Sequence, residues 1–178
     1  MSDVRPSREL IGKPIVSVTN GVIIGKVVDI LIDPATVQVA ALATSKGGLL
    51  THRGEMEAIA AKDVQVWGQD AVLVSGPDVI ARQDDLPDRQ RWLSVADQVK
   101  GRDVVSIDGT RIGQLNDIVL NTQGQLVAYD LAQVFVKGPV AESRRIPAEV
   151  TQSFGRDVLL VARIEADEIR TEEQPEES

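Results

Sequence analysis

Two aspartates stand inside strongly aliphatic stretches of the chain, where a carboxylate needs a special reason to be present. Asp29 lies in the stretch 25–33 and Asp117 lies in the stretch 113–121, each four residues after a glycine. An unpaired carboxylate is costly to bury, so each side chain must either face solvent or accept hydrogen bonds. We interpret both as acceptors for backbone N–H groups of a neighbouring turn, which would fasten the fold. A proton-linked or ligand-binding role is the alternative interpretation.

Other groups that could do chemistry are scarce in this sequence. His52 is the only histidine and the chain has no cysteine. This excludes a multi-histidine metal site, a thiolate metal site and a disulfide framework. The acidic residues lack the alternating spacing that a dedicated calcium loop requires. The sequence therefore predicts no catalytic residues, no metal and no cofactor, and we expect the protein not to be an enzyme.

The two aspartates occupy equivalent positions in a segment that occurs twice. Each copy opens with a serine that we expect to cap a helical turn, Ser7 in the first and Ser94 in the second. A hairpin turn follows in each, with Gly21 or Gly109 supplying the positive φ that such turns require. The agreement continues through the later strands, so the sequence predicts a duplicated domain.

Each copy has the pattern of a small β domain. Aliphatic runs separated by Gly, Pro, Asp and Asn predict an all-β fold of two tandem small antiparallel β-barrels with short helical turns. Gly25 and Gly113 are interpreted as kinks that let a strand curve where a side chain would clash. Because aromatics are only 3% of residues, Val, Ile, Leu and Ala must fill the cores. The predicted divisions are a first barrel at 1–76, an interdomain segment at 77–93, a second barrel at 94–164 and an acidic disordered tail at 165–178.

Composition narrows the class of partner. The chain has 178 residues and a net charge of −8, which disfavours direct contact with nucleic acid or with anionic membrane surfaces. No apolar run is long enough to span a membrane, and the first residues lack a hydrophobic signal core. We therefore expect a cytoplasmic protein, with any peripheral membrane association made through a partner.

The copies differ most in the loop that precedes their last strands. Apolar residues in or beside these loops would form contact patches if exposed, with a protein partner, with the other barrel or with a second copy of the chain. The two adjacent arginines of the second copy form its strongest positive cluster, for which solvated loop charge is the alternative explanation. The predicted contact residues are Leu49, Leu50, Trp92, Phe135, Arg144 and Arg145.

The motifs of both copies resemble the PRC-barrel family. The matching positions are Gly12-Lys13 and Gly101-Arg102, the Ile-Gly motif with its aspartate at 24–33 and 112–121, and the Ile-Pro segment at 146–150. The first copy departs from the pattern at Ala60, where the second has Pro147. The resemblance covers roughly Ser7 to Val161 and implies compact barrels of five or six strands.

What the resemblance implies about function is docking rather than catalysis. Family members form the cytoplasmic domain of a photosynthetic reaction-centre subunit and the carboxy-terminal half of a ribosome maturation factor. Our hypothesis is a non-enzymatic binding or scaffold protein that docks on a protein partner or a larger assembly. One alternative is a peripheral subunit or assembly factor of a photosynthetic or electron-transfer complex, whose carboxylates affect proton delivery. The other is a ribosome-maturation-type adaptor, which the acidic balance disfavours.

Overall fold

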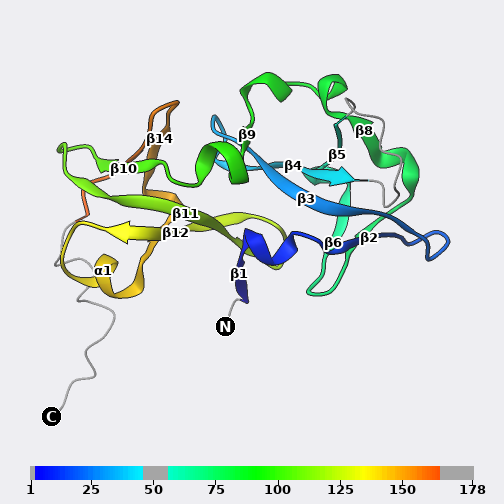
Figure 1. Cartoon of the computed structure of the whole chain (residues 1–178), viewed down its shortest axis with the longest axis horizontal. Helices are drawn as coiled ribbons and strands as arrows, with labels where there is room; N and C mark the ends of the chain where they lie inside the picture. The colour runs from blue at the N-terminus through cyan, green and yellow to red at the C-terminus, as the bar shows by residue number, and fades with distance from the viewer. Residues whose placement is uncertain (1–2, 46–55, 165–178) are drawn as a thin grey trace, which may run out of the picture.

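The chain folds into two curved sheets that lie side by side along the long axis of the molecule (Figure 1). The computed structural model describes residues 3–45 and 56–164. Most strand pairs are antiparallel, and one parallel pair in each sheet joins the first strand of a repeat to its last. The prediction of an all-β fold with two tandem units is confirmed.

The first sheet has the strand order β6-β7-β2-β3-β4-β5-β8, with β9 added to β3. Its consecutive strands β2 to β5 form the predicted hairpin and continue as an antiparallel meander. The strands are β2 (Pro14–Ser17), β3 (Ile23–Asp33), β4 (Gln38–Ser45), β5 (Glu57–Ala60), β6 (Val64–Trp67), β7 (Val72–Val74), β8 (Ile80–Arg82) and β9 (Leu93–Ser94).

The second sheet repeats this plan with the order β13-β12-β11-β10-β15-β14, and β1 is added to β11. It has no strand in the place that β8 takes in the first sheet, as far as the described residues show. Its strands are β1 (Val4–Pro6), β10 (Asp103–Ser106), β11 (Arg111–Asn121), β12 (Leu126–Val134), β13 (Arg145–Pro147), β14 (Thr151–Phe154) and β15 (Val158–Val161), and the short helix α1 (Pro139–Ser143) precedes β13.

The helical turns that open the two repeats differ in their caps. Ser94 caps the turn Val95–Val99 as predicted, because its hydroxyl accepts a hydrogen bond from the N–H of Asp97. The prediction for Ser7 is wrong. The turn Ser7–Leu10 begins after Pro6 without a side-chain cap, and the Ser7 hydroxyl is used elsewhere.

The short strands β1 and β9, which precede the two repeats in the chain, are exchanged between the sheets. β1 precedes the first repeat in the chain and pairs with the second half of β11, in the second sheet. β9 precedes the second repeat and pairs with the second half of β3, in the first sheet. Each long central strand therefore pairs with a short strand from the other repeat. As a result, each sheet contains residues from both sides of the predicted boundaries at 76 and 94.

The core is mainly aliphatic and continuous between the repeats. One cluster of buried side chains contains residues of both sheets, from Leu10 to Val161. At the junction, the ring of Trp67 packs so closely on the turn at Gly124 that a Cβ there would lie 2.1 Å from it. On β1, the Arg5 guanidinium donates to the carbonyls of Trp67 and Gly68 at 2.9 and 2.7 Å. The repeats therefore form one packed body.

Candidate functional site

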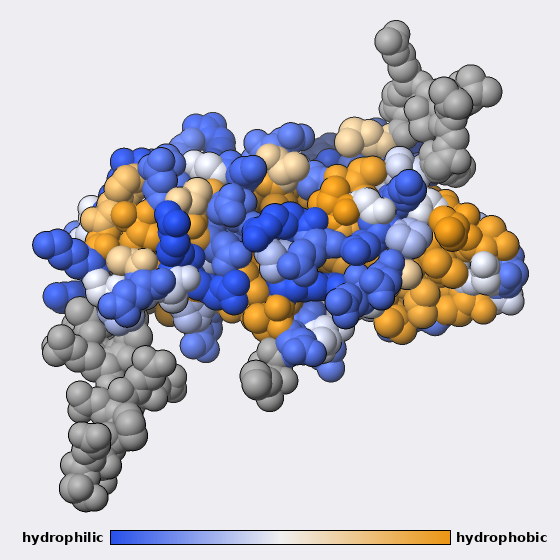
Figure 2. All heavy atoms as spheres, turned by 60° about the horizontal axis from the view of Figure 1, so that its bottom comes forward, coloured by the Kyte–Doolittle hydropathy of each residue, from blue (hydrophilic) through white to orange (hydrophobic). Residues whose placement is uncertain are grey.

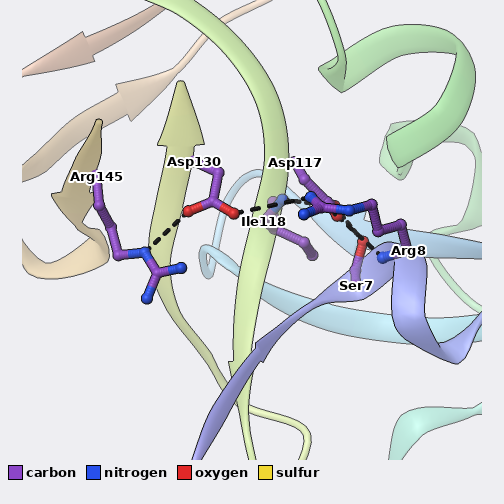
Figure 3. Close-up of polar contacts among 6 residues, drawn as sticks. All are labelled: Ser7, Arg8, Asp117, Ile118, Asp130 and Arg145. Atoms are coloured by element: carbon purple, nitrogen blue, oxygen red, sulfur yellow. Dashed lines mark hydrogen bonds and ion pairs between the residues drawn. The ribbon is translucent and has the colours of Figure 1, made fainter. Parts of the chain in front are cut away.

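Asp117 on β11 lies at the point where the beginning of the chain crosses the second sheet (Figure 3). It is 4% exposed. The Ser7 hydroxyl and the N–H of Ile118 donate to Oδ1, the latter at 2.8 Å, and the N–H of Arg8 donates to Oδ2 at 2.9 Å. The carboxylate thus accepts from a turn of the other repeat and from its own strand.

Asp29 makes the same set of contacts in the first sheet and is half-buried. The Ser94 hydroxyl donates to Oδ2, and the N–H groups of Ala96 and Ile30 donate to Oδ1 at 3.2 and 2.8 Å. The two aspartates therefore contact the exchanged turns reciprocally. Their fastening role remains a prediction, and so does any proton-linked role.

A bulge gives each aspartate this orientation. The register between β3 and β4 shifts between Val27 and Asp29, and the equivalent shift in β11 lies between Leu115 and Asp117. Side chains of a regular strand alternate between its two faces, so Asp29 would point into the core as Val27 does. The bulge changes this, and Ile30 points into the core instead. The carboxylate is left beside the N–H of the following residue, which donates to it.

Two glycines allow the long strands to approach their neighbours closely. A Cβ at Gly25 would lie 2.9 Å from the carbonyl oxygen of Ser45, and one at Gly113 would lie 2.2 Å from that of Gln133. Both distances are shorter than real Cβ contacts, so a side chain would push the strands apart. These clashes agree with the interpretation of both glycines as positions where a side chain cannot fit.

An ion-pair chain extends from Asp117 in the second repeat. The Arg8 guanidinium lies 3.4 Å from Asp117 and 3.8 Å from Asp130, and the Nε of Arg145 donates to Asp130 at 2.8 Å (Figure 3). In the first sheet, Ala43 pairs with Asp29 where Asp130 pairs with Asp117. The charged chain is therefore not required by the fold that the repeats share.

The predicted contact residues are dispersed over the structure. Phe135 is 48% exposed and lies under the guanidinium of Arg111, whose central carbon is 4.2 Å from the ring centre. Arg144 is exposed and donates to the carbonyl of Ala132 at 2.8 Å. Trp92 is half-buried and packs in a small cluster with Leu86 on the outside of the first sheet. Two further predicted residues, Leu49 and Leu50, fall outside the described residues, as does His52.

Arg91 ties the interdomain segment to the end of β3. Its guanidinium donates to Asp33 at 2.8 Å. Burial alone would raise the pKa of Asp33, but the hydrogen bonds from Arg91 and from the N–H of Ala35 outweigh it and lower the pKa below the ordinary value. This contact was not predicted, because nothing in the spacing of the segment marks its partner.

Comparison with known proteins identifies the duplicated unit. A scan of protein families matches the PRC-barrel domain to residues 2–79 and again to residues 95–171. The chain belongs to the PRC-barrel family. No curated protein matches it. Membership indicates a non-catalytic module.

Two further findings concern classes of site. Within residues 3–45 and 56–164, no three His, Cys, Asp or Glu side chains are placed to hold a metal ion. No helix in the same part of the chain combines the length and apolarity needed to cross a membrane.

The first PRC-barrel repeat carries an exposed apolar row that the sequence analysis missed. Val66, Leu73, Val16 and Ile23 are lateral neighbours across β6, β7, β2 and β3, so their side chains share one side of the sheet. Ile23 is 62% exposed and Val66 is 45% exposed. Together with Val18, which is 49% exposed, these residues form what we call the apolar face. Figure 2 shows hydrophobic residues gathered at the end of the molecule that holds these strands.

The equivalent row of the second PRC-barrel repeat is polar at both ends. Its members are Ser153, Leu160, Val105 and Arg111, paired in the same way across β14, β15, β10 and β11. Arg111 takes the place of Ile23 and forms an ion pair with Asp103 at 2.8 Å. Ile107, the counterpart of Val18, is apolar and exposed as well, so the feature that belongs to the first repeat and not to the shared scaffold is the apolar residue at each end of the row, Ile23 and Val66.

Proposed function

We propose that this protein is a non-catalytic protein-binding module whose binding surface is the apolar face of the first repeat. The observation that carries the proposal is the contrast between Ile23 and Val66 in the first repeat and Arg111 and Ser153 at the same places in the second. Because the second repeat folds without them, these exposed side chains are not needed for the scaffold. Contiguous exposed apolar side chains on a folded protein are typical of a contact surface.

The expected occupant is a different protein rather than a second copy of the chain. Val18, Ile23 and Val66 are about half exposed or more, and Val16 and Leu73 are partly buried, so the apolar face amounts to at most on the order of 400 Å². Two copies meeting through it would bury about 800 Å² in total, below the roughly 1,000 Å² that a stable interface needs. A larger partner surface could also cover flanking polar residues such as Lys26, which lies on β3 opposite Pro14 of β2. No contact among the described residues favours an electron-transfer or a ribosomal assembly.

The test places a photo-crosslinking amino acid at Ile23 of the full chain and, as a matched control, at Ile107. Ile107 is 58% exposed on the equivalent side of the second repeat. In cells of the source organism, we expect one crosslinked product of defined mass from position 23, none from position 107, and loss of the product when Val66→Asp is added. Equal products from both positions would refute the proposal. A product with the mass of two chains would also refute it, since it would assign the apolar face to self-association.

A further inference from the structure

The two sheets end differently at equivalent strands. β5 and β13 correspond, because Ile59 pairs with Leu42 in the first sheet as Ile146 pairs with Tyr129 in the second. The outer edge of β5 is covered by β8. In the part of the chain that the structure describes, β13 pairs only with β12. The first repeat therefore shows how a strand sits on an edge that the second repeat leaves open.

The strand β8 defines the geometry of such an addition. It runs antiparallel to β5, with Ala81 opposite Ala58 and Ile80 opposite Ile59. The N–H of Gln83 continues the ladder by donating to the carbonyl of Met56 at 2.7 Å. Ile80 packs against the main core. A short segment of three residues is thus enough to combine backbone hydrogen bonds with one apolar contact.

At the open edge of β13, the hydroxyl of Ser143 forms the hydrogen bonds that an added strand would form. Arg145 corresponds to Ala58, and its N–H and carbonyl both lie 3.3 Å from the hydroxyl oxygen of Ser143. Hydrogen bonds of this length are weak, and an incoming strand would replace both. Pro147 lacks an N–H, but it corresponds to Ala60, which lies beyond the residues that β8 pairs. The edge therefore retains the backbone groups that β5 uses.

The charge at the edge is reversed between the repeats. Glu57 of β5 lies opposite Arg82 of β8, whereas the corresponding residue of the second repeat is Arg144. Its neighbour Arg145 keeps 41% of its side chain exposed despite the ion pair with Asp130. Arg8, on the same corner, is 60% exposed. The corner therefore presents arginines in a chain whose net charge is −8.

We propose that the open edge of β13 binds an extended acidic segment of a partner protein, which adds to the second sheet as an antiparallel strand. If the segment lies on β13 as β8 lies on β5, an aliphatic residue of the segment stands opposite Ile146, and acidic residues stand opposite Arg145 and Arg144. Backbone hydrogen bonds supply the attachment, and the arginines select for negative charge. This site is separate from the apolar face, so neither proposal depends on the other.

The test measures binding of the labelled hexapeptide Thr-Ile-Glu-Glu-Val-Thr to the full chain by fluorescence anisotropy. We expect saturable binding that is lost when the first glutamate of the peptide is N-methylated, because that position must donate to the edge. A peptide in which glutamine replaces both glutamates should bind the unmodified protein about fivefold more weakly, and so should the original peptide with the protein variant Arg145→Ala. The matched control Arg156→Ala removes an arginine that is 92% exposed on another strand connection, and it should bind as the unmodified protein does.

Three outcomes would overturn the proposal. One is the absence of saturable binding. Another is equal binding of the N-methylated peptide, which would mean charge attraction without strand addition. The third concerns residues 165–178 of the chain, which are themselves acidic. If the peptide binds only after Glu165→Gln, Asp167→Asn and Glu168→Gln are introduced together, the edge is occupied by the chain itself rather than by a partner. The peptide variants leave the protein unaltered, so misfolding of Arg145→Ala does not affect the N-methylation result.

Discussion

Replacing Asp117 with alanine tests whether the exchanged turns hold the two repeats together. The substitution removes the acceptor for the Ser7 hydroxyl and for the N–H groups of Arg8 and Ile118. Hydrogen bonds to a charged group contribute about 1.5–3 kcal/mol each, and the Arg8 N–H can regain water. We therefore expect Asp117→Ala to lower the free energy of unfolding by about 3 kcal/mol. Ser7→Ala removes one of these bonds and should lower it by about 1.5–2 kcal/mol.

The assay is urea unfolding followed by two signals. Tryptophan fluorescence reports on Trp67 and Trp92, which both belong to the first sheet and its covering segment, whereas far-ultraviolet circular dichroism reports on both sheets. Because Asp117 lies in the second sheet and the ring of Trp67 packs on the turn of that sheet at Gly124, a fluorescence transition that shifts together with the circular dichroism transition shows that the repeats unfold as one body. Asp157→Ala, which alters an ion pair whose carboxylate is 80% exposed, is the surface control and should change neither signal.

The decisive comparison is a double-mutant cycle. If Ser7 and Asp117 act through their mutual contact, the effect of the double variant should fall short of the sum of the single effects by about 1 kcal/mol. Additive effects, or a loss below about 1 kcal/mol for Asp117→Ala, would refute the reasoning. The corresponding variant Asp29→Ala should have the smaller effect, because Asp29 is only half-buried.

Three further predictions concern single positions. Gly124→Ala should lower the free energy of unfolding, measured in urea, by about 2–3 kcal/mol, because the position combines a positive φ with a clash against the ring of Trp67. The control is Gly109→Ala, where φ is +85 but the space is open, and it should cost about 1 kcal/mol. Burial raises the pKa of Tyr129 to about 12. The folded state therefore keeps the phenol proton that the unfolded chain loses above about pH 10. The free energy of unfolding should consequently fall by about 2–3 kcal/mol between pH 10 and 12. As this is the only tyrosine, tyrosinate absorbance should rise together with unfolding, and a titration near pH 10 in the folded protein would contradict the burial argument. The pKa of Asp33 is lowered in the folded protein, so the stabilisation by its carboxylate is present above about pH 4 and is lost as the pH falls through the pKa of the folded state. Arg91→Gln should therefore make the urea midpoint less sensitive to acid. An unchanged pH dependence would contradict the role of Arg91 in lowering this pKa.

The repeats and most of the β topology could be predicted from the sequence because their signals are local. Glycines at 21 and 109 take positive φ in their hairpin turns, as the turn chemistry requires. The exchange of β1 and β9 could not be predicted. These strands have three and two residues, too few for any periodicity, and their pairing is decided by distant segments.

The candidate surfaces were predictable only in part. In a sequence filled with Val, Ile and Leu, an outward residue such as Val16 has the same type as an inward one such as Ile15, so alternation does not show which side faces solvent. Phe135, Arg144 and Arg145 were predicted as contact residues because they stand out in or beside a divergent loop, and this stays a prediction. Among residues 3–45 and 56–164, no strand covers the edge of β13 beside them, and only the comparison of the two sheets reveals this.

The strand exchange also sets an order in which the protein can be completed as it is synthesised. β9 emerges soon after the first sheet, but β1 must wait for β11, and Ser7 and Asp117 are separated by 110 residues. At about 5–20 residues per second, this delay is roughly 5–20 s. During that time the start of the chain has no partner strand within the first repeat. The strand β1 can therefore dock only after β11 has been made, and a ribosome that pauses before β11 prolongs the interval in which β1 remains available to other strands.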